Sequence, residues 1–230
     1  MANGQPAAGE RFVNGLFSEN PTFRQILGIC PTLAVTYSVA SALTMAAAVT
    51  FVLVCSNILI SLIRGLLKPH LRILVFTLTI AVFVTIADRL VAAYLYEMSK
   101  SLGPYIPLII VNCIIIARCE IVASKSPLLP AITDALGQAG GHTLGLLAIA
   151  SAREILGKGT WFDMNVLSGA WPDWGVMVAA PGAFLTLGLL LGLVNHLTGE
   201  RGRAMWPIVA LVRWFNLFGR KRQVAAAQEK

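Results

Sequence analysis

Two cysteines are notable because each lies at an interruption of a short apolar segment. Cys30 precedes Pro31 in a segment of 13 residues, and Cys113 follows Asn112 in a segment of 15 residues. Proline removes a backbone donor and disfavours helix at the residue before it, while an asparagine side chain competes for backbone hydrogen bonds. Cysteine thiolates bind soft metals and iron–sulfur clusters, so both thiols are candidate metal ligands.

Both segments are too short to cross a membrane as continuous helices. Residues 25–37 and 103–117 would rise only about 20–22 Å, against a hydrocarbon core of about 30 Å. An iron–sulfur cluster usually has four thiolate ligands, so a cluster at these residues requires thiolates from another chain. The alternative is inert packing of each cysteine. We favour that interpretation for Cys55, within an intact apolar stretch, and for Cys119, beyond the end of the second segment.

The composition is that of an integral membrane protein. Of 230 residues, 57% are hydrophobic and 13% are charged, whereas a soluble domain has about 25% charged residues. No charge occurs in residues 25–63 or 174–196, and a membrane span needs roughly 20 apolar residues. The net charge is +7, and the basic residues cluster at the edges of apolar runs. This pattern favours membrane topology over nucleic-acid binding.

Six membrane crossings are predicted, in two sets of three. Residues 21–98 contain the first set and residues 99–198 the second. Residues 1–20 are expected to form a flexible cytoplasmic leader, and residues 199–230 an amphipathic basic tail on the cytoplasmic leaflet. Asp134 is predicted to cap the fifth helix, which ends at Ala152. One side of the membrane receives 14 lysines and arginines and the other three, so both termini are predicted to be cytoplasmic.

The predicted fold is an all-α membrane fold made of two inverted repeats. Each set of three crossings begins with one of the short segments, and three is odd, so the second set enters from the opposite face. The first helix of each repeat is expected to be broken into half-helices, with Cys30 and Cys113 approaching the membrane midplane from opposite sides. Unwound backbone at that depth is stable only when it is buried in protein or lines a cavity. A bound group is therefore expected between the breaks.

The fifth predicted span carries a stripe of small residues. Gly137, Gly141 and Gly145 recur every four residues, which predicts a face for close packing between helices. His142 lies beside this stripe and is expected to be a hydrogen-bonded packing residue. The sequence contains no dinucleotide fingerprint, no P-loop and no plausible Ser/His/Asp arrangement, so it predicts no binding of nicotinamide or flavin by this chain alone.

The two cysteine segments resemble the signature segments of the NqrD/RnfE family of membrane subunits. The similarity extends over about residues 18–198, and the basic C-terminal extension favours the RnfE branch over its sodium-pumping quinone reductase relative. The segments that carry the resemblance are Leu27–Thr36, Ser61–Arg64, Ile106–Arg118, Ala123–Pro127, Arg153–Thr160 and Pro181–Phe184.

This resemblance implies a subunit of the Rnf complex of bacterial inner membranes, which couples electron transfer between ferredoxin and NAD to movement of Na⁺ or H⁺. It implies a homologous six-span partner of opposite topology, RnfA, together with the other Rnf subunits and the surrounding lipid. The two homologous chains would hold a [2Fe–2S] centre with two cysteines from each. The matching positions here are Cys30 and Cys113, and Cys55 and Cys119 have no family role.

Two other functions fit the same pattern. A secondary transporter also uses inverted repeats and broken helices, and it predicts solute uptake by the purified chain alone. Few polar side chains lie near Cys30 in the predicted membrane interior, which disfavours a transporter. A scaffold subunit would have no redox centre of its own, and iron analysis of the complex would distinguish it from a redox subunit.

Overall fold

A computed structural model describes residues 8–66, 69–162, 164–165 and 175–197 of the chain. The chain divides into two units, residues 1–188 and 189–230. Within the second unit the structure describes only the last part of one helix, so the expected basic tail lies outside the described residues. The contacts discussed below all belong to the first unit.

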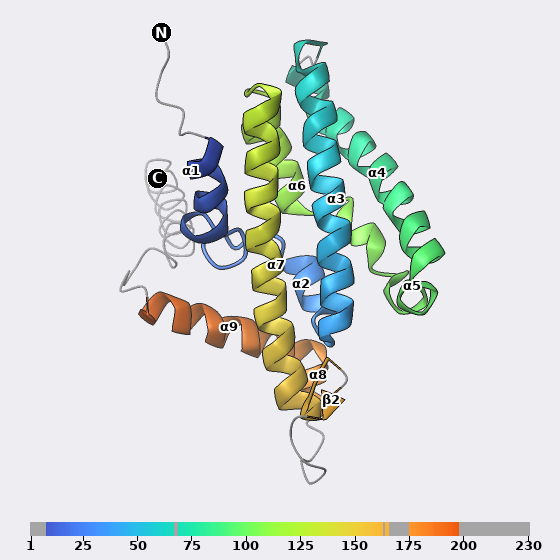
Figure 1. The fold of residues 1–230 in the computed structure, drawn as a ribbon, viewed down its shortest axis with the longest axis vertical. Coiled ribbons are helices and arrows are strands. Elements are labelled where there is room, and N and C mark those ends of the chain that lie inside the picture. Colours follow the sequence, from blue (N-terminus) through green and yellow to red (C-terminus); the bar gives the residue numbers. More distant parts are fainter. Residues whose placement is uncertain (1–7, 67–68, 163, 166–174, 198–230) are drawn as a thin grey trace, which may run out of the picture. The chain divides into compact units, whose positions relative to one another are not determined.

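The described residues are mostly helical (Figure 1). One short antiparallel hairpin, in which Thr160 pairs with Asn165, follows the longest helix. The elements are α1 (Ala8–Val13), η1 (Asn14–Ser18), α2 (Ile29–Val35), α3 (Val39–Ile63), η2 (Arg64–Leu66), η3 (Pro69–Leu71), α4 (Arg72–Tyr94), α5 (Tyr96–Leu102), η4 (Ile106–Ile109), α6 (Cys113–Arg118), η5 (Cys119–Ala123), α7 (Leu128–Lys158), β1 (Thr160–Trp161), β2 (Met164–Asn165), α8 (Gly175–Val178) and α9 (Ala180–Leu197).

Helices α3 and α7 lie side by side and run in opposite directions (Figure 1). At one end, the backbone N–H of Val39 donates to Oε2 of Glu154 over 2.7 Å. At the other end, Oγ of Ser61 donates to the carbonyl oxygen of Ser126 over 3.2 Å. The first pair joins the start of α3 to the end of α7, and the second joins the end of α3 to the start of α7. This antiparallel pair is the frame of the described fold.

Three helical stretches among the described residues are long and apolar enough to cross a membrane. They are Val39–Ile63, Arg72–Tyr94 and Ile106–Ala123. Helix α7 is longer than any of them, but its glycines together with Gln138 and His142 lower its hydropathy. The six crossings and the inverted repeat therefore stay predictions, while the mostly helical membrane-protein architecture is confirmed.

Helix α2 begins earlier than the sequence predicted. The prediction that the Cys30-Pro31 pair interrupts a helix is wrong, because α2 starts at Ile29 and contains both residues. The interruption is at Gly28, the last residue before the helix, whose φ of 76° is left-handed. Pro31 is the third residue of α2, where a missing backbone N–H is harmless because that N–H has no partner within the helix.

The second predicted interruption lies where the sequence placed it. Asn112 is the residue before α6, and its side chain accepts a hydrogen bond from the N–H of Ile114 over 3.2 Å. The prediction that Asp134 caps a helix is wrong, because α7 already begins at Leu128. Pro130 occupies the first turn of α7, where proline is tolerated. The six residues directly before Asp134 are therefore helical.

The glycine stripe of α7 is a close-packing face, as predicted, but its partner is the N-terminal segment of the chain. A Cβ on Gly137 would lie 2.7 Å from the carbonyl oxygen of Phe12, and a Cβ on Gly145 would lie 2.7 Å from Cβ of Thr22. Within the expected leader, residues 8–18 form α1 and η1, and both pack against α7. The absence of side chains on the stripe allows this backbone to lie directly on the helix.

Candidate functional site

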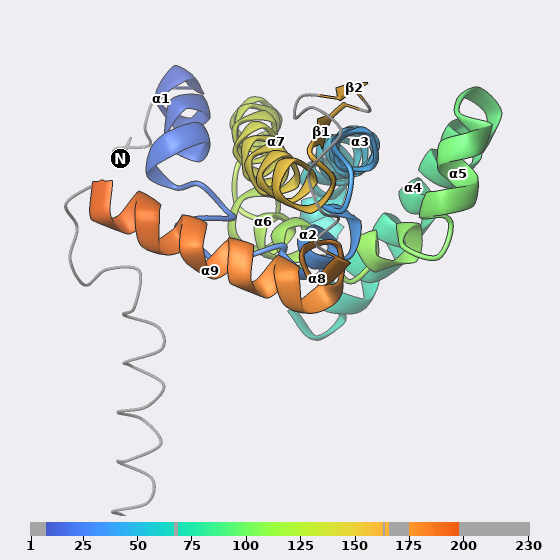
Figure 2. The same ribbon diagram turned by 90° about the horizontal axis from the view of Figure 1, so that it is seen from below.

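The half-helices α2 and α6 begin next to each other and run toward opposite ends of the α3–α7 pair. The N–H of Gly28, directly before α2, donates to Sγ of Cys113, the first residue of α6, over 2.9 Å. Helix α2 then runs toward the end of the pair where Val39 meets Glu154. Helix α6 continues through η5 toward the other end, where Ser61 meets Ser126. Figure 2 shows both half-helices close to α3.

The meeting point lies midway along the frame. A Cβ placed on Gly28 would lie 3.0 Å from Cε1 of His142, and His142 occupies the middle of α7. It lies about 21 Å from the start of that helix and about 24 Å from its end at 1.5 Å per residue. If α7 crosses the membrane, this position is close to the midplane. The structure thus brings the two predicted half-helices together beside the middle of α7, and their depth in a membrane stays a prediction.

Gly28 is required at this position for two reasons. Its φ of 76° lies in the left-handed region, which residues other than glycine adopt at a cost of roughly 1–2 kcal/mol. A Cβ at Gly28 would also overlap Cδ1 of Ile114 and press on the His142 ring. Only glycine therefore lets the backbone N–H approach the Cys113 sulfur this closely.

Each predicted ligand lies in the first turn of its half-helix: Cys30 two residues after Gly28, whose N–H contacts Cys113, and Cys113 at the start of α6. Cys30 is exposed and Cys113 is half-buried, and both are free thiols. The positive end of a helix favours negatively charged groups, so both positions suit a sulfur that carries charge when it binds a metal. No group of three or more His, Cys, Asp or Glu side chains in the described part of the chain could hold a metal ion. The two thiols form at most half of a four-ligand site.

Cys113 opens onto a pocket of about 720 Å³. Its wall is mostly apolar, and within it Nη1 of Arg72 lies 3.4 Å from Oε1 of Glu120. A half-buried thiol in such a pocket can be reached by a group from another chain. The lining residues are Leu27, Arg72, Ile73, Phe76, Val111, Cys113, Ile116, Ala117, Glu120 and Ile121.

The far end of α2 is held by Arg153, a residue that sequence reasoning placed in a loop. Its guanidinium donates from Nη1 to Oγ1 of Thr36 over 2.7 Å. It also donates to the carbonyl oxygens of Met177, Val178 and Ala179 over 2.8–3.1 Å. We call this set, Arg153 with Thr36 and the three carbonyls, the Arg153 anchor. It joins the end of α2 to the end of α8.

The Arg153 side chain is 2% exposed, and this burial lowers the pKa of its guanidinium from the ordinary value. Hydrogen bonds to oxygen atoms favour the charged form, so the group remains a cation at neutral pH. Thr36 connects the Arg153 anchor to the preceding turn of α2, because its hydroxyl donates to the carbonyl of Thr32 over 2.6 Å. The hydroxyl of Thr32 donates in turn to the carbonyl of Gly28 over 2.7 Å. A hydrogen-bonded row thus runs from the Arg153 anchor to the glycine that contacts Cys113.

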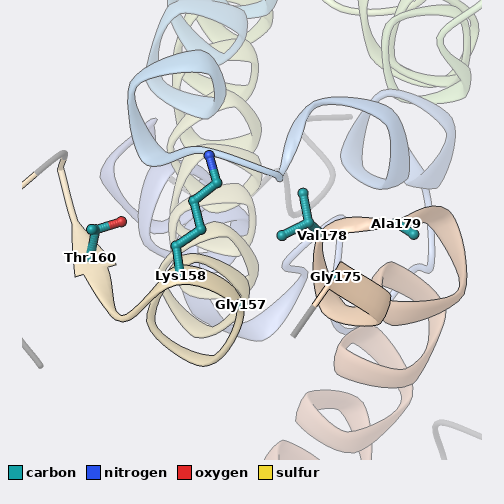
Figure 3. Close-up of a pocket in the computed structure, with 6 residues that line it drawn as sticks. All are labelled: Gly157, Lys158, Thr160, Gly175, Val178 and Ala179. Carbon is teal, nitrogen blue, oxygen red and sulfur yellow. The ribbon is translucent and has the colours of Figure 1, made fainter. Parts of the chain in front are cut away.

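A second pocket, of about 660 Å³, lies beside the Arg153 anchor (Figure 3). Figure 3 shows Lys158 and Thr160 on one side and Val178 on the other. The described lining has one cationic side chain and neither an acid nor a thiol, and so suggests no redox or metal chemistry. The lining residues are Gly157, Lys158, Thr160, Gly175, Val178 and Ala179.

A buried ion pair, with a third, exposed member, was also missed by sequence reasoning. Arg118 is 6% exposed and lies 3.6 Å from Oδ1 of Asp134 and 3.5 Å from Oε2 of Glu19. It joins the end of α6 to α7 and to the N-terminal segment. The presence of Arg118 and Asp134 inside otherwise apolar runs was the available signal, because buried charges need partners of opposite sign.

The other two cysteines lie on other elements than α2 and α6. Cys55 is half-buried within α3. Cys119 is buried in η5, where its Sγ lies 3.4 Å from Oδ1 of Asn57. Both positions agree with the packing roles that the sequence suggested.

Comparison with known proteins identifies the family to which this chain belongs. Residues 8–191 match the family described as "Rnf-Nqr subunit, membrane protein". The chain belongs to the Rnf-Nqr subunit family. This Rnf-Nqr chain is therefore a multi-pass membrane protein, and its resemblance to the NqrD/RnfE family is confirmed.

The relatives of this Rnf-Nqr chain carry similar names but differ in the ion named. The E subunit of the Na⁺-translocating ferredoxin:NAD⁺ oxidoreductase complex of Acetobacterium woodii is 44% identical over 82% of this chain and 96% of the relative. The E subunit of the ion-translocating oxidoreductase complex of Methanosarcina acetivorans is 44% identical over 80% and 89%. The E subunit of the proton-translocating ferredoxin:NAD⁺ oxidoreductase complex of Clostridium ljungdahlii is 38% identical over 80% and 86%.

Proposed function

We propose that this chain is a membrane subunit of an ion-translocating ferredoxin:NAD oxidoreductase complex. In this proposal it relays electrons through an intramembrane [2Fe–2S] centre and couples the relay to movement of Na⁺ or H⁺. Cys30 and Cys113 supply two ligands, and a homologous six-span subunit of opposite topology, RnfA-like, supplies the other two. The names of the relatives support the complex and its reaction.

The observation that carries the site is the 2.9 Å hydrogen bond from the Gly28 N–H to the Cys113 sulfur. It joins the starts of two half-helices, each with a cysteine in its first turn. Backbone N–H donors directed at a ligand sulfur are one of the means by which proteins set the potential of iron–sulfur clusters. Two thiols without a third ligand in the described chain also fit a centre shared between two subunits.

The residues of this chain have separable tasks in the proposed relay. A bound [2Fe–2S] centre would accept and release one electron at a time. Cys30 and Cys113 would bind it, and the apolar wall around Cys113 would keep water away. The row of hydrogen bonds from the Arg153 anchor through Thr36 would hold the first of these half-helices in position.

The proposed setting is the bacterial inner membrane, with both termini in the cytoplasm. Opposed half-helices with their first turns at mid-depth are the arrangement that inverted repeats produce, and they support the proposed mirrored partner. The translocated ion in this proposal is either Na⁺ or H⁺. The relatives named for Na⁺ and for protons are 44% and 38% identical to this chain.

The direct test replaces Cys113 with serine in the assembled complex. We expect Cys113→Ser to remove the iron of one [2Fe–2S] centre and its electron paramagnetic resonance signal, because a serine oxygen is a poor ligand for iron–sulfur clusters. Cys55→Ser, in an intact helix, is the matched control and should retain both. Unchanged iron and signal in Cys113→Ser would contradict the assignment.

The same preparations separate the other two functions. A scaffold subunit predicts that no cysteine variant of this chain changes the iron content. A secondary transporter predicts solute uptake by the purified chain in vesicles, with transport retained in Cys30→Ser and Cys113→Ser.

A further inference from the structure

His142 is a fully buried side chain with one ring nitrogen bonded and the other without a partner in the described structure. The residue is 1% exposed. Its Nδ1 lies 3.2 Å from Oγ1 of Thr22, whereas Nε2 is buried without a hydrogen-bond partner among the described residues. Leaving a buried donor or acceptor unpaired costs free energy, because the group has lost its hydrogen bonds to water. A leucine of similar volume would fill the same space without that cost, so the orphaned nitrogen requires an explanation.

The imidazole lies against the cysteine site. Its Cε1 atom, the ring carbon between the two nitrogens, is the atom that a Cβ on Gly28 would approach at 3.0 Å. The N–H of the same glycine donates to Sγ of Cys113. The ring and the thiol are thus both neighbours of one residue, at the meeting point of α2 and α6.

The N-terminal segment fixes the orientation of the ring. The backbone N–H of Thr22 donates to Oδ1 of Asn20 over 3.0 Å. The amide of Asn20 donates in turn to the carbonyl of Gly141 over 3.1 Å. Thr22 also packs on Gly145. Thr22 is therefore fixed on either side of His142, through Asn20 at Gly141 and directly at Gly145. Its hydroxyl lies next to Nδ1 of the ring.

We propose that Nε2–H of His142 donates a hydrogen bond to a sulfur atom of the centre held by Cys30 and Cys113, and that this bond raises the reduction potential of the centre. In this proposal the Thr22 hydroxyl, 3.2 Å from Nδ1, donates to that nitrogen and the ring hydrogen is on Nε2. The inference rests on the proposed function, because it requires a cluster at the two cysteines. A donor to a cluster sulfur stabilises the reduced, more negative state more than the oxidised state.

The experiment uses the whole complex carrying His142→Leu or His142→Gln. Iron and labile sulfide are measured first, and the midpoint potential of the [2Fe–2S] signal is then measured by redox titration. We expect His142→Leu to keep its iron and to show a more negative midpoint potential. His142→Gln, whose amide N–H can replace the donor, should recover part of the shift. Thr143→Val, on the same helix, should leave the potential unchanged.

Thr22→Val should shift the potential in the same direction as His142→Leu but by less, because it releases the tautomer without removing the ring. An unchanged potential in an iron-replete His142→Leu complex would overturn the inference and leave His142 as a packing or water-binding residue. If the Cys30→Ser and Cys113→Ser complexes contain as much iron as the wild-type complex, the proposed function is overturned instead.

A second measurement keeps the inference testable if His142→Leu does not assemble. In wild-type complex labelled with ¹⁵N-histidine, pulsed electron paramagnetic resonance reports the coupling of the ring nitrogen to the reduced centre. The inference predicts a weak coupling, as expected for a nitrogen hydrogen-bonded to sulfur. A strong coupling would show that His142 binds iron directly and would overturn the proposed role, as would the absence of any histidine coupling.

Discussion

The two ends of helix α2 differ in how complete they are within this chain. At the far end, the buried Arg153 guanidinium makes four hydrogen bonds, to one hydroxyl and three carbonyls. At the near end, Cys30 is exposed, Cys113 is half-buried, and Nε2 of His142 lacks a described partner. The chain itself completes the hydrogen bonding at one end, whereas at the other end the proposed function assigns ligands and a donor to a group that the chain does not supply.

This difference indicates that one end of the seven-residue helix α2 provides rigidity and the other end provides function. The Arg153 anchor joins the Thr36 hydroxyl at the end of α2 to the last carbonyls of α8, so the half-helix needs no second half to hold it in place. The open end can then present a thiol to the proposed centre. Stability should therefore depend mainly on the anchor, and cofactor content mainly on the cysteine site.

The largest effect on stability is expected from Arg153→Met. The substitution removes the donor of the buried Thr36 hydroxyl and of three partly buried carbonyls, and we expect a loss of about 3–5 kcal/mol in the free energy of unfolding. The loss is measured by thermal unfolding of the detergent-purified protein. Lys158→Met, one and a half turns further along α7 at an exposed position, is the control. Equal stability of the two variants would contradict the role of the anchor.

Gly28→Ala should affect both stability and cofactor content. The left-handed backbone and the overlap with Ile114 together should cost about 2–3 kcal/mol. The displaced backbone N–H should also lower the iron content of the complex. Gly65→Ala is the control, since a Cβ there meets nothing within 4 Å. A Gly28→Ala complex with normal iron and stability would show that the close approach to Cys113 is dispensable.

A smaller effect is expected at Glu154, which accepts from the first N–H of α3. Glu154→Ala removes that acceptor and should cost about 1–2 kcal/mol, comparable to the loss of a helix cap. Glu154→Gln retains an acceptor oxygen and should cost less. Chemical denaturation of the two variants measures the difference. If Gln were as destabilising as Ala, the charge rather than the hydrogen bond to Val39 would be the important property.

The smallest effect is expected from Cys55→Ala. Cys55 is half-buried within the intact helix α3, so its replacement should cost less than about 1 kcal/mol and leave iron content unchanged. Parallel thermal unfolding and iron analysis test both expectations. Loss of iron in this variant would mean that the ligand set had been assigned to the wrong helix.

Local chemistry explains which features could be predicted from the sequence. Asn112 signalled the start of α6 because its side chain has only nearby backbone to bond. Pro31 misled the prediction, because a proline can either interrupt a helix or occupy its first turn, and only the φ of Gly28 decides between these outcomes. The Arg153 anchor depends on carbonyls about 25 residues further along the chain, and Arg153 alone gives no indication of them. The partner of the glycine stripe was likewise hidden, since the pattern specifies close approach but not what approaches.

The most direct test of a shared cysteine site is the iron and labile sulfide content of complexes carrying Cys30→Ser, Cys113→Ser and both substitutions together. If the two thiols bind one shared [2Fe–2S] centre, each single variant should lose the iron of that centre, and the double variant should lose no more. Normal iron in either single variant, or a double variant that loses twice as much as each single variant, would contradict a common site.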